Sequence, residues 1–273
     1  MYPVIFAFGS VRIYAFSTFC ILGALLFCVI SYRLLKQYRL PWMAMFDHSI
    51  PLVVMSLVVG RVLHVFFQYV QYQDQYFRMM YLLDGGVFIY GALACFLGLL
   101  ILFLQREQQD IALWLDILAA PAAGASALFS LGSFLAGKHI GLPTNSPLGI
   151  TLDGPHIPLS GVAVHPVDLY MMALMVLFFL LSMFLLTRHV KSVGSGRLFA
   201  MFLMTFAIAQ LLIQKHVADI AYVWNGYNLE IVLSWWSLVL GFGYIFYRRL
   251  SHYAYQTLQK THILDHIPRR YRR

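Results

Sequence analysis

The chain has 273 residues, of which 61% are hydrophobic and only 11% are charged, and its mean hydropathy is +0.74. Because about a quarter of the residues of a soluble domain are charged, this composition excludes an ordinary soluble protein and indicates an integral membrane protein. The formal net charge of +8 does not indicate nucleic-acid binding. The cations lie beside apolar runs or in one short tail, where anionic lipid headgroups attract them.

Seven apolar runs predict an all-α integral membrane protein with seven transmembrane helices, since a spanning helix needs about 20 mainly apolar residues. The predicted spans are 11–32, 48–67, 82–104, 111–136, 168–187, 198–214 and 230–247. No basic region precedes the first run and no small-residue cleavage site follows it. We therefore expect this run to remain in the protein as a membrane helix.

The loops predict the orientation of these spans. Of the 19 Lys and Arg residues, fourteen fall on one side of the alternating loops, seven of them between Arg248 and Arg273. By the positive-inside rule the C-terminus is cytoplasmic, and with seven spans the N-terminus lies outside. We expect one membrane domain over residues 1–250, with an outer loop region over 137–167, and a basic cytoplasmic tail over 251–273.

Metal and cofactor chemistry has little support in the sequence. All three cysteines lie inside apolar runs, where a thiol behaves as a small hydrophobe, and no disulfide framework or Cys/His zinc spacing is present. His139, His156, His165 and Asp168 fall in or beside the long outer loop, but their spacing matches no compact ligand pattern. We therefore expect neither a metal nor a cofactor.

Polar residues inside the spans point to a buried polar site, because a charged group at mid-bilayer costs several kcal/mol unless it is paired or hydrated. Arg61 and His64 lie on one helical face, and Asp84, followed by Gly85 and Gly86, opens the third predicted span. Two interpretations have equal weight. Arg61 and Asp84 form a buried ion pair that fixes helix register, or they bind a lipid headgroup.

The segment from Ser130 to Gly141 places glycines, hydroxyls and the pair Lys138-His139 directly after a long apolar run. Irregular backbone at membrane depth is tolerated only where protein or water covers it, so this segment predicts a cavity. Its histidine, and His165 further along the loop, fall near the outer boundary of the membrane. Histidine is the side chain best suited to act as a base at neutral pH.

Short motifs along nearly the whole chain match one family in their order and spacing. They are Pro3–Phe6, Gly9, Gly60-Arg61, Asp84-Gly85-Gly86, Tyr90-Gly91, Asp116–Pro121, Leu131–Phe134, Gly137, Gly141, His165-Pro166, Leu169-Tyr170 and Gly194–Gly196. With these motifs the chain resembles the bacterial phosphatidylglycerol:prolipoprotein diacylglyceryl transferases. The resemblance implies a place in the bacterial inner membrane. It also implies transfer of a diacylglyceryl group from phosphatidylglycerol to a lipoprotein-precursor cysteine on the outer side.

The chain departs from this family at the positions that the resemblance marks as catalytic or supporting. Uncharged residues replace the Arg and Asn of the signature G-R-x-G-N-F, a His of the third span, and an Arg and a Glu of the sixth span. In the same order, they are Ser130, Ser133, Tyr90, Gln210 and Gln214. A serine cannot replace the charge or the bidentate fork of a guanidinium. A phenol, with an unperturbed pKa of about 10, does not replace an imidazole base.

Two explanations are compatible with these replacements. Ser, Gln and Tyr can line a lipid cavity without the cost of an unpaired charge, which favours loss or weakening of the conventional transfer. The protein would then be a membrane protein that binds phospholipid or lipoprotein without catalysis. The alternative is a related lipid transfer that uses His139 or His165, so both an enzyme and a non-enzyme stay open.

We expect lipid binding to persist in either case. The residues expected to carry it supply a charge or a glycine at which a ligand approaches the backbone. They are Arg61, Asp84, Gly85, Gly86, Gly132, Gly137 and Gly141. The expected partners are membrane phospholipid, in the first place phosphatidylglycerol, and a lipoprotein precursor or another envelope protein.

Overall fold

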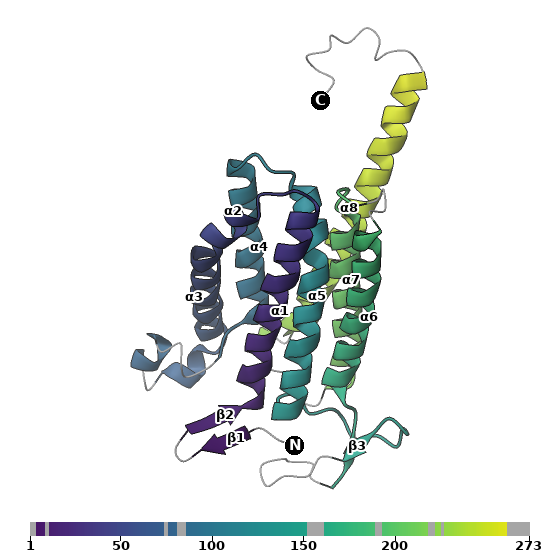
Figure 1. The fold of residues 1–273 in the computed structure, drawn as a ribbon. Helices are drawn as coiled ribbons and strands as arrows, with labels where there is room; N and C mark the ends of the chain where they lie inside the picture. The colour runs from purple at the N-terminus through teal and green to yellow at the C-terminus, as the bar shows by residue number, and fades with distance from the viewer. Residues whose placement is uncertain are drawn as a thin grey trace.

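The computed structural model describes residues 4–8, 11–73, 76–80, 86–151, 161–188, 193–217, 222–224 and 227–260. Seven of its helices are long and apolar enough to cross a membrane. They are α1 (Ala15–Gln37), α3 (Ser49–Phe67), α4 (Ile89–Arg106), α5 (Ile111–Ala136), α6 (Val167–Thr187), α7 (Arg197–Gln214) and α8 (Leu229–Lys260). The prediction of an all-α, seven-helix membrane protein is confirmed, and the helices form one bundle (Figure 1).

Short elements connect the spanning helices at both ends of the bundle. Three antiparallel hairpins lie at the end that carries the N-terminus (Figure 1). They pair β1 (Val4–Phe8) with β2 (Val11–Tyr14), β3 (Ile150–Thr151) with β4 (Ala163–Val164), and β5 (Val223–Trp224) with β6 (Tyr227–Asn228). The 3-10 helices η1 (Tyr69–Tyr72) and η2 (Tyr76–Met80) lie at this end too, and the short helix α2 (Trp42–Asp47) lies at the other.

Two predicted spans begin earlier than the helices they describe. Residues 11–14 form β2 instead of the start of a span, because Val11 and Ile13, branched at Cβ, favour extended backbone and pair with β1. The third span was expected from residue 82, but α4 begins only at Ile89. Gly86 has a φ of +75°, a left-handed conformation that does not continue a right-handed helix.

Helix α5 forms the centre of the bundle. In its most apolar stretch 56% of the residues are buried, against 17–28% for the other spans. Small residues allow neighbouring helices to approach it closely: a Cβ on Gly124 would lie 2.7 Å from Leu26 of α1, and a Cβ on Gly23 would lie 3.2 Å from the Ala125 carbonyl. The helix is therefore held from several sides and provides a rigid support for the segment after its C-terminus.

Asp116 joins α5 to the start of α7. Its carboxylate is fully buried and accepts backbone N–H groups from Gly194 and Gly196, both at 2.9 Å, and from Phe199 at 3.0 Å. A carboxylate at a helix N-terminus satisfies orphan amides and interacts favourably with the helix dipole. Asp116 therefore holds the start of α7 against α5.

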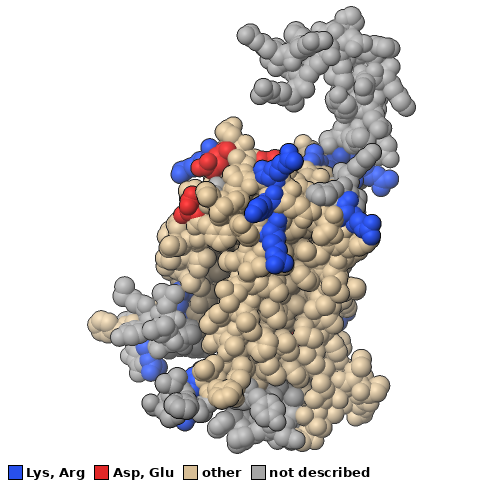
Figure 2. All heavy atoms as spheres, in the orientation of Figure 1, with Lys and Arg blue, Asp and Glu red and all other residues tan. Residues whose placement is uncertain are grey.

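The charged side chains fix the orientation of the bundle. Lys and Arg gather at the end where α1 leads into α2 and α8 leaves the bundle, while the middle is almost free of them on the face shown (Figure 2). The positive-inside rule assigns this end to the cytoplasm, which is the orientation expected from the sequence. Helix α8 continues as one helix from its apolar part into residues 251–260. The division into a domain at 1–250 and a tail at 251–273 stays a prediction.

Candidate active site at the outer end of the bundle

Gly137 ends α5 and turns the chain back toward the helix. It has a φ of +68°, and its N–H donates to the Phe134 carbonyl at 3.1 Å. The next N–H, of Lys138, donates to the Ser133 carbonyl at 3.2 Å. Glycine is the usual residue at such a left-handed helix end because it carries no Cβ. The turn places Lys138 and His139 at the outer mouth of the bundle.

His139 is the centre of a polar cluster at this end. Its Nδ1 atom lies 2.8 Å from Oδ1 of Asp168, in the first turn of α6, and 3.1 Å from the hydroxyl of Ser133, in the last turn of α5. Asp168 and Ser133 are 8% and 1% exposed, whereas the His139 side chain is 49% exposed. Two buried groups therefore hold one nitrogen of an accessible imidazole.

The surroundings of His139 favour its charged form. The hydrogen bond to Asp168 raises the pKa of His139 against the opposing effect of burial, and the charges of Asp168 and Glu230 act in the same direction. Lys138 lies with Nζ 3.2 Å from the ring centroid of Phe16 on α1, a cation–π contact. Burial lowers the pKa of Lys138. The ammonium of Lys138 and the imidazole of His139 thus lie near the carboxylates of Asp168 and Glu230 at this end.

A second polar group joins α7 to α8. The amide of Gln214 donates to the carboxylate of Glu230, and its carbonyl accepts from Asn228 at 3.0 Å. The Glu230 N–H donates to the Asn228 side chain at 2.9 Å. The hydroxyl of Tyr90 is buried near Glu230 and Ser234. Gln214 and Tyr90, which were predicted from separate spans, therefore surround one carboxylate.

The sequence analysis did not identify Glu230. This residue lies in the first turn of α8, at the edge of a run that was assigned as a span by its hydropathy alone. An ionisable residue within an apolar run is a functional candidate by default. A residue-by-residue inspection of the seventh run would have found it.

Arg61 is held by the backbone on the outer side of α3. Arg61 is 3% exposed, and its guanidinium donates to the carbonyls of Arg78, Gly86 and Met79 at 2.7, 3.0 and 3.3 Å. The group also lies 5.4 Å from the ring of Tyr72. Three carbonyl acceptors fix this side chain in place, and Arg61 in turn holds the segment after α3. The proposed pairing with Asp84 falls outside the described residues, as does Gly85.

His64, one turn further along α3, shares a partner with Arg61. Its Nε2 lies 3.2 Å from the Tyr72 hydroxyl and its Nδ1 lies 2.9 Å from the Tyr222 hydroxyl. An added Cβ on Gly86 would collide with the His64 ring. The contact with Tyr222 joins α3 to the loop between α7 and α8. His64 therefore ties the α3–α4 pair to the rest of the bundle at the outer end.

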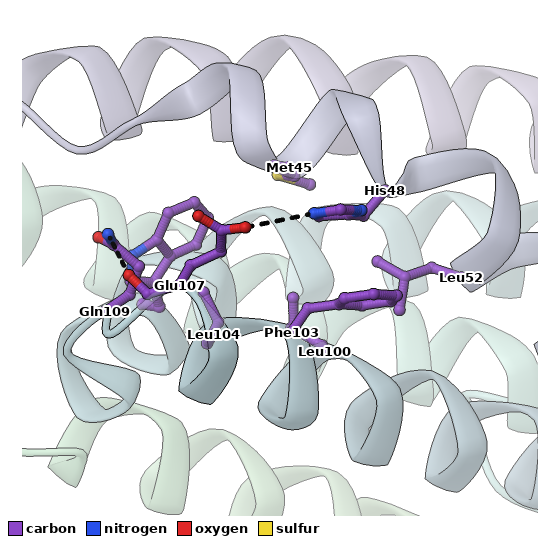
Figure 3. Close-up of a pocket in the computed structure, with 9 residues that line it drawn as sticks. Met45, His48, Leu52, Leu100, Phe103, Leu104, Glu107 and Gln109 are labelled. Carbon is purple, nitrogen blue, oxygen red and sulfur yellow. Dashed lines mark hydrogen bonds and ion pairs between the residues drawn. The ribbon is translucent and has the colours of Figure 1, made fainter.

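A small pocket lies at the opposite, cytoplasmic end (Figure 3). The His48 ring stacks on Phe103 with centroids 4.3 Å apart, and its Nε2 lies 3.8 Å from the Glu107 carboxylate. The Trp114 indole nitrogen is buried there and has no hydrogen-bond partner among the described residues. The volume, about 20 Å³, suits about one water molecule and excludes a lipid. The cavity predicted at residues 130–141 stays a prediction.

The family model for prolipoprotein diacylglyceryl transferase matches residues 3–247. This chain belongs to the prolipoprotein diacylglyceryl transferase family. Three relatives named phosphatidylglycerol–prolipoprotein diacylglyceryl transferase show how far this chain has diverged in sequence. The Clostridium tetani protein is 24% identical over 214 residues (78% of this chain, 84% of the relative) and the Parasynechococcus marenigrum protein is 26% identical over 219 residues (78% of each). The Listeria welshimeri protein is 27% identical over 207 residues (73% and 72%). The family and the seven spans together place the chain in the bacterial inner membrane as a multi-pass protein.

Several of the residues that were predicted as catalytic-position or lipid-binding residues pack within the protein. The Ser130 hydroxyl donates to the Ser126 carbonyl of its own helix at 3.0 Å. Gln210 is half-buried on α7. A Cβ on Gly132 would lie 2.6 Å from Phe19 of α1, and one on Gly141 would collide with the His165 carbonyl. These glycines therefore allow close packing of the segment that ends in His139.

His165 belongs to a separate contact group. Its Nδ1 lies 3.1 Å from the Tyr170 hydroxyl, and its ring centroid lies 4.6 Å from that of His216. His156 falls outside the described residues. Within the described ranges, no group of three or more His, Cys, Asp or Glu side chains is placed to hold a metal ion. Of the two histidines predicted as substitutes, only His139 has a buried carboxylate partner among the described residues.

Proposed function

We propose that this protein binds phosphatidylglycerol at the outer leaflet and performs the conventional diacylglyceryl transfer weakly or not at all. The observation that carries the proposal is that Ser130, at the position of the family's catalytic Arg, donates its hydroxyl to its own helix. A serine in that bond offers no charge to a phosphate. The resemblance further supports a lipoprotein precursor or another envelope protein as partner.

The chemistry of the transfer explains why this loss matters. When a thiolate sulfur attacks the glyceryl carbon, the carbon–oxygen bond to the phosphate breaks and glycerol phosphate leaves with the electron pair. Preorganised cations stabilise the charge that develops on such a leaving group. Arg61 is bound by three backbone carbonyls, and positions 210 and 214 hold neutral amides. The conventional site therefore lacks most of its electrostatic support.

Lipid binding is supported by the outer mouth of the bundle. Lys138 and the half-exposed His139 directly follow the end of the spanning helix α5, and an ammonium near the interface attracts anionic lipid by about 1 kcal/mol. We assign Arg61, Gly132 and Gly141 a supporting role, because each is in contact with the protein itself. In this proposal they shape the site, and their direct contact with lipid stays a prediction.

A second candidate function is a related lipid transfer with a different base. The observation that favours it is the hydrogen bond between His139 and Asp168. Two measurements distinguish weak transfer from no transfer. One is the lipidation of lipoproteins in cells, and the other is the transfer of lipid to a peptide thiol in vesicles.

Complementation tests the proposed function. The chain is expressed in bacterial cells depleted of their own transferase, with the Clostridium tetani relative as positive control, and lipoprotein lipidation is followed by gel mobility. We expect at most a small fraction of the control's lipidation, whereas full restoration would overturn the proposal.

The triple variant Y90H/S130R/Q210R tests the cause of that weakness. It restores the imidazole and the two guanidinium groups of the family and is expected to increase lipidation over the unmodified chain.

Lipid binding is measured separately on the purified full-length protein. Phosphatidylglycerol is expected to co-purify in detergent and to be enriched over phosphatidylethanolamine. Lys138→Gln should reduce that enrichment, whereas Lys36→Gln, at the cytoplasmic end of α1, should not. Equal amounts of the two lipids would contradict the binding proposal.

A further inference from the structure

The pair His139 and Asp168 has the geometry of a positioned base. A carboxylate that accepts the Nδ1 proton fixes the tautomer, so that Nε2 carries the free lone pair. Asp168 Oδ1 lies 2.8 Å from Nδ1, and the His139 side chain is 49% exposed. The imidazole is thus held through Nδ1, while about half of its side chain stays exposed.

The cluster is not a Ser-His-Asp triad, although it contains these three residue types. In a triad the serine bonds one ring nitrogen and the aspartate bonds the other. Here Ser133 and Asp168 both approach Nδ1, and Ser133 is only 1% exposed. Ser133 cannot reach an external substrate as a nucleophile. The nucleophile must come from outside and meet Nε2.

The buried carboxylate of Asp168 is a suitable partner for an imidazole that takes up a proton. Asp168 is 8% exposed, and its second oxygen, Oδ2, is buried with no hydrogen-bond partner among the described residues. A carboxylate that water does not solvate interacts more strongly with an imidazolium than one at the surface. Asp168 therefore stabilises the protonated form of His139.

Three charged groups act on His139 from the elements around it. Asp168 of α6 and Glu230 of α8 favour its protonation, and Lys138, its neighbour after α5, opposes it. The balance raises the pKa of His139 above the ordinary imidazole value, which keeps the group close to the pH range in which a general base works best.

We infer that His139 is the catalytic base of a slow lipid transfer to a thiol presented at the outer face, and that Asp168 is its positioning residue. Nε2 takes the proton from the S–H group, and the sulfur forms a bond to the glyceryl carbon of the phospholipid. The carbon–oxygen bond to the phosphate breaks, and glycerol phosphate leaves with the electron pair. The imidazolium then loses its proton to water outside the membrane. The inference rests on the lipid binding proposed above.

The test uses the full-length protein in phosphatidylglycerol vesicles with a soluble peptide that carries one cysteine in a lipoprotein-type sequence. Release of glycerol phosphate and the mass of the lipidated peptide are followed from pH 5.5 to 9. A base of this kind contributes about 10²- to 10⁴-fold to a rate. We expect H139Q to lower the rate at least tenfold, while H48Q, at the cytoplasmic end, leaves it unchanged.

The pH profile separates a positioning role for Asp168 from a merely structural one. The unmodified protein should gain rate as pH rises through the pKa of His139. D168N removes the charge that raises this pKa, so its rising limb should move to lower pH while its maximum falls. NMR titration of the His139 ring, identified by the signal that H139Q lacks, should show the same downward shift of the pKa in D168N.

Two results would overturn the inference. If H139Q transfers lipid as fast as the unmodified protein, His139 is not the base. If the unmodified protein transfers no lipid to the thiol, the inference fails while co-purified phosphatidylglycerol still supports the binding proposal. Loss of lipid enrichment would instead remove the binding proposal itself.

Discussion

The side-chain amide of Gln214 on α7 donates a hydrogen bond to the carboxylate of Glu230 on α8. The resemblance places an acidic residue of the family at position 214, where this chain has an amide. The carboxylate of this region is therefore supplied by the neighbouring helix. Asn228 completes the network by donating to Gln214. The amide of Gln214 and the carboxylate of Glu230 thus form a donor–acceptor pair.

Gln214→Glu should destabilise the protein for this reason. Two half-buried carboxylates would then face each other, and one of them would have to take up a proton. The change is expected to lower the free energy of unfolding by about 2 kcal/mol, measured by thermal unfolding in detergent. The double variant Q214E/E230Q restores an amide–carboxylate pair with the roles exchanged and should recover most of the loss. If both variants lose equal stability, the pairing is not the cause.

Asp116→Asn should cost more than any change at the exposed caps. The carboxylate accepts three backbone N–H groups in a fully buried position, and the amide NH₂ of asparagine would point a donor at a donor. We expect a loss of about 2–4 kcal/mol, measured by thermal unfolding.

Asp110→Asn is the matched control for this change. Asp110 caps α5 through one exposed bond to the Leu113 N–H at 3.2 Å, and asparagine caps a helix about as well as aspartate. This variant should lose less than about 1 kcal/mol. Similar losses in the two variants would show that burial of Asp116 does not decide its effect.

The seven spans could be predicted from the sequence because each contains enough consecutive apolar residues to cross a bilayer. The start of α1 could not, because the hydropathy of Val11–Tyr14 is equally compatible with a helix and with the strand that pairs with β1. The partner of His139 lies 29 residues away on another helix, so only the packing of α5 against α6 brings the two together. The catalytic and lipid-binding roles assigned from the sequence stay predictions.

Gly86→Ala should destabilise the outer end of α3. Gly86 has a φ of +75°, and a Cβ there would collide with the His64 ring. Left-handed backbone costs an alanine about 1–2 kcal/mol, and displacement of His64 would also break its bonds to Tyr72 and Tyr222. We expect a loss of about 3 kcal/mol, measured by thermal unfolding.

Gly161→Ala separates the two contributions. Gly161 has a φ of +80°, and no atom of the described residues lies within 4 Å of an added Cβ, so its variant carries the backbone strain alone. The difference between the two variants then measures the displacement of His64. If Gly86→Ala loses no more stability than Gly161→Ala, the contact with His64 does not contribute.

The stability of the protein should fall as pH rises through the pKa of His139. The hydrogen bond and charge of Asp168 raise this pKa in the folded state. A group whose pKa is raised on folding binds its proton more tightly in the folded protein, so its stabilisation is fully present below the ordinary imidazole value of about 6.5. That stabilisation is lost as pH rises through the higher folded value.

Asp168→Asn removes the main cause of the shift and should flatten the dependence of the melting temperature on pH from 6 to 9. His139→Gln should flatten it equally, because either change removes the same linkage. If the unmodified protein and both variants keep parallel pH curves, another group is responsible, and the coupling between His139 and Asp168 is absent in solution.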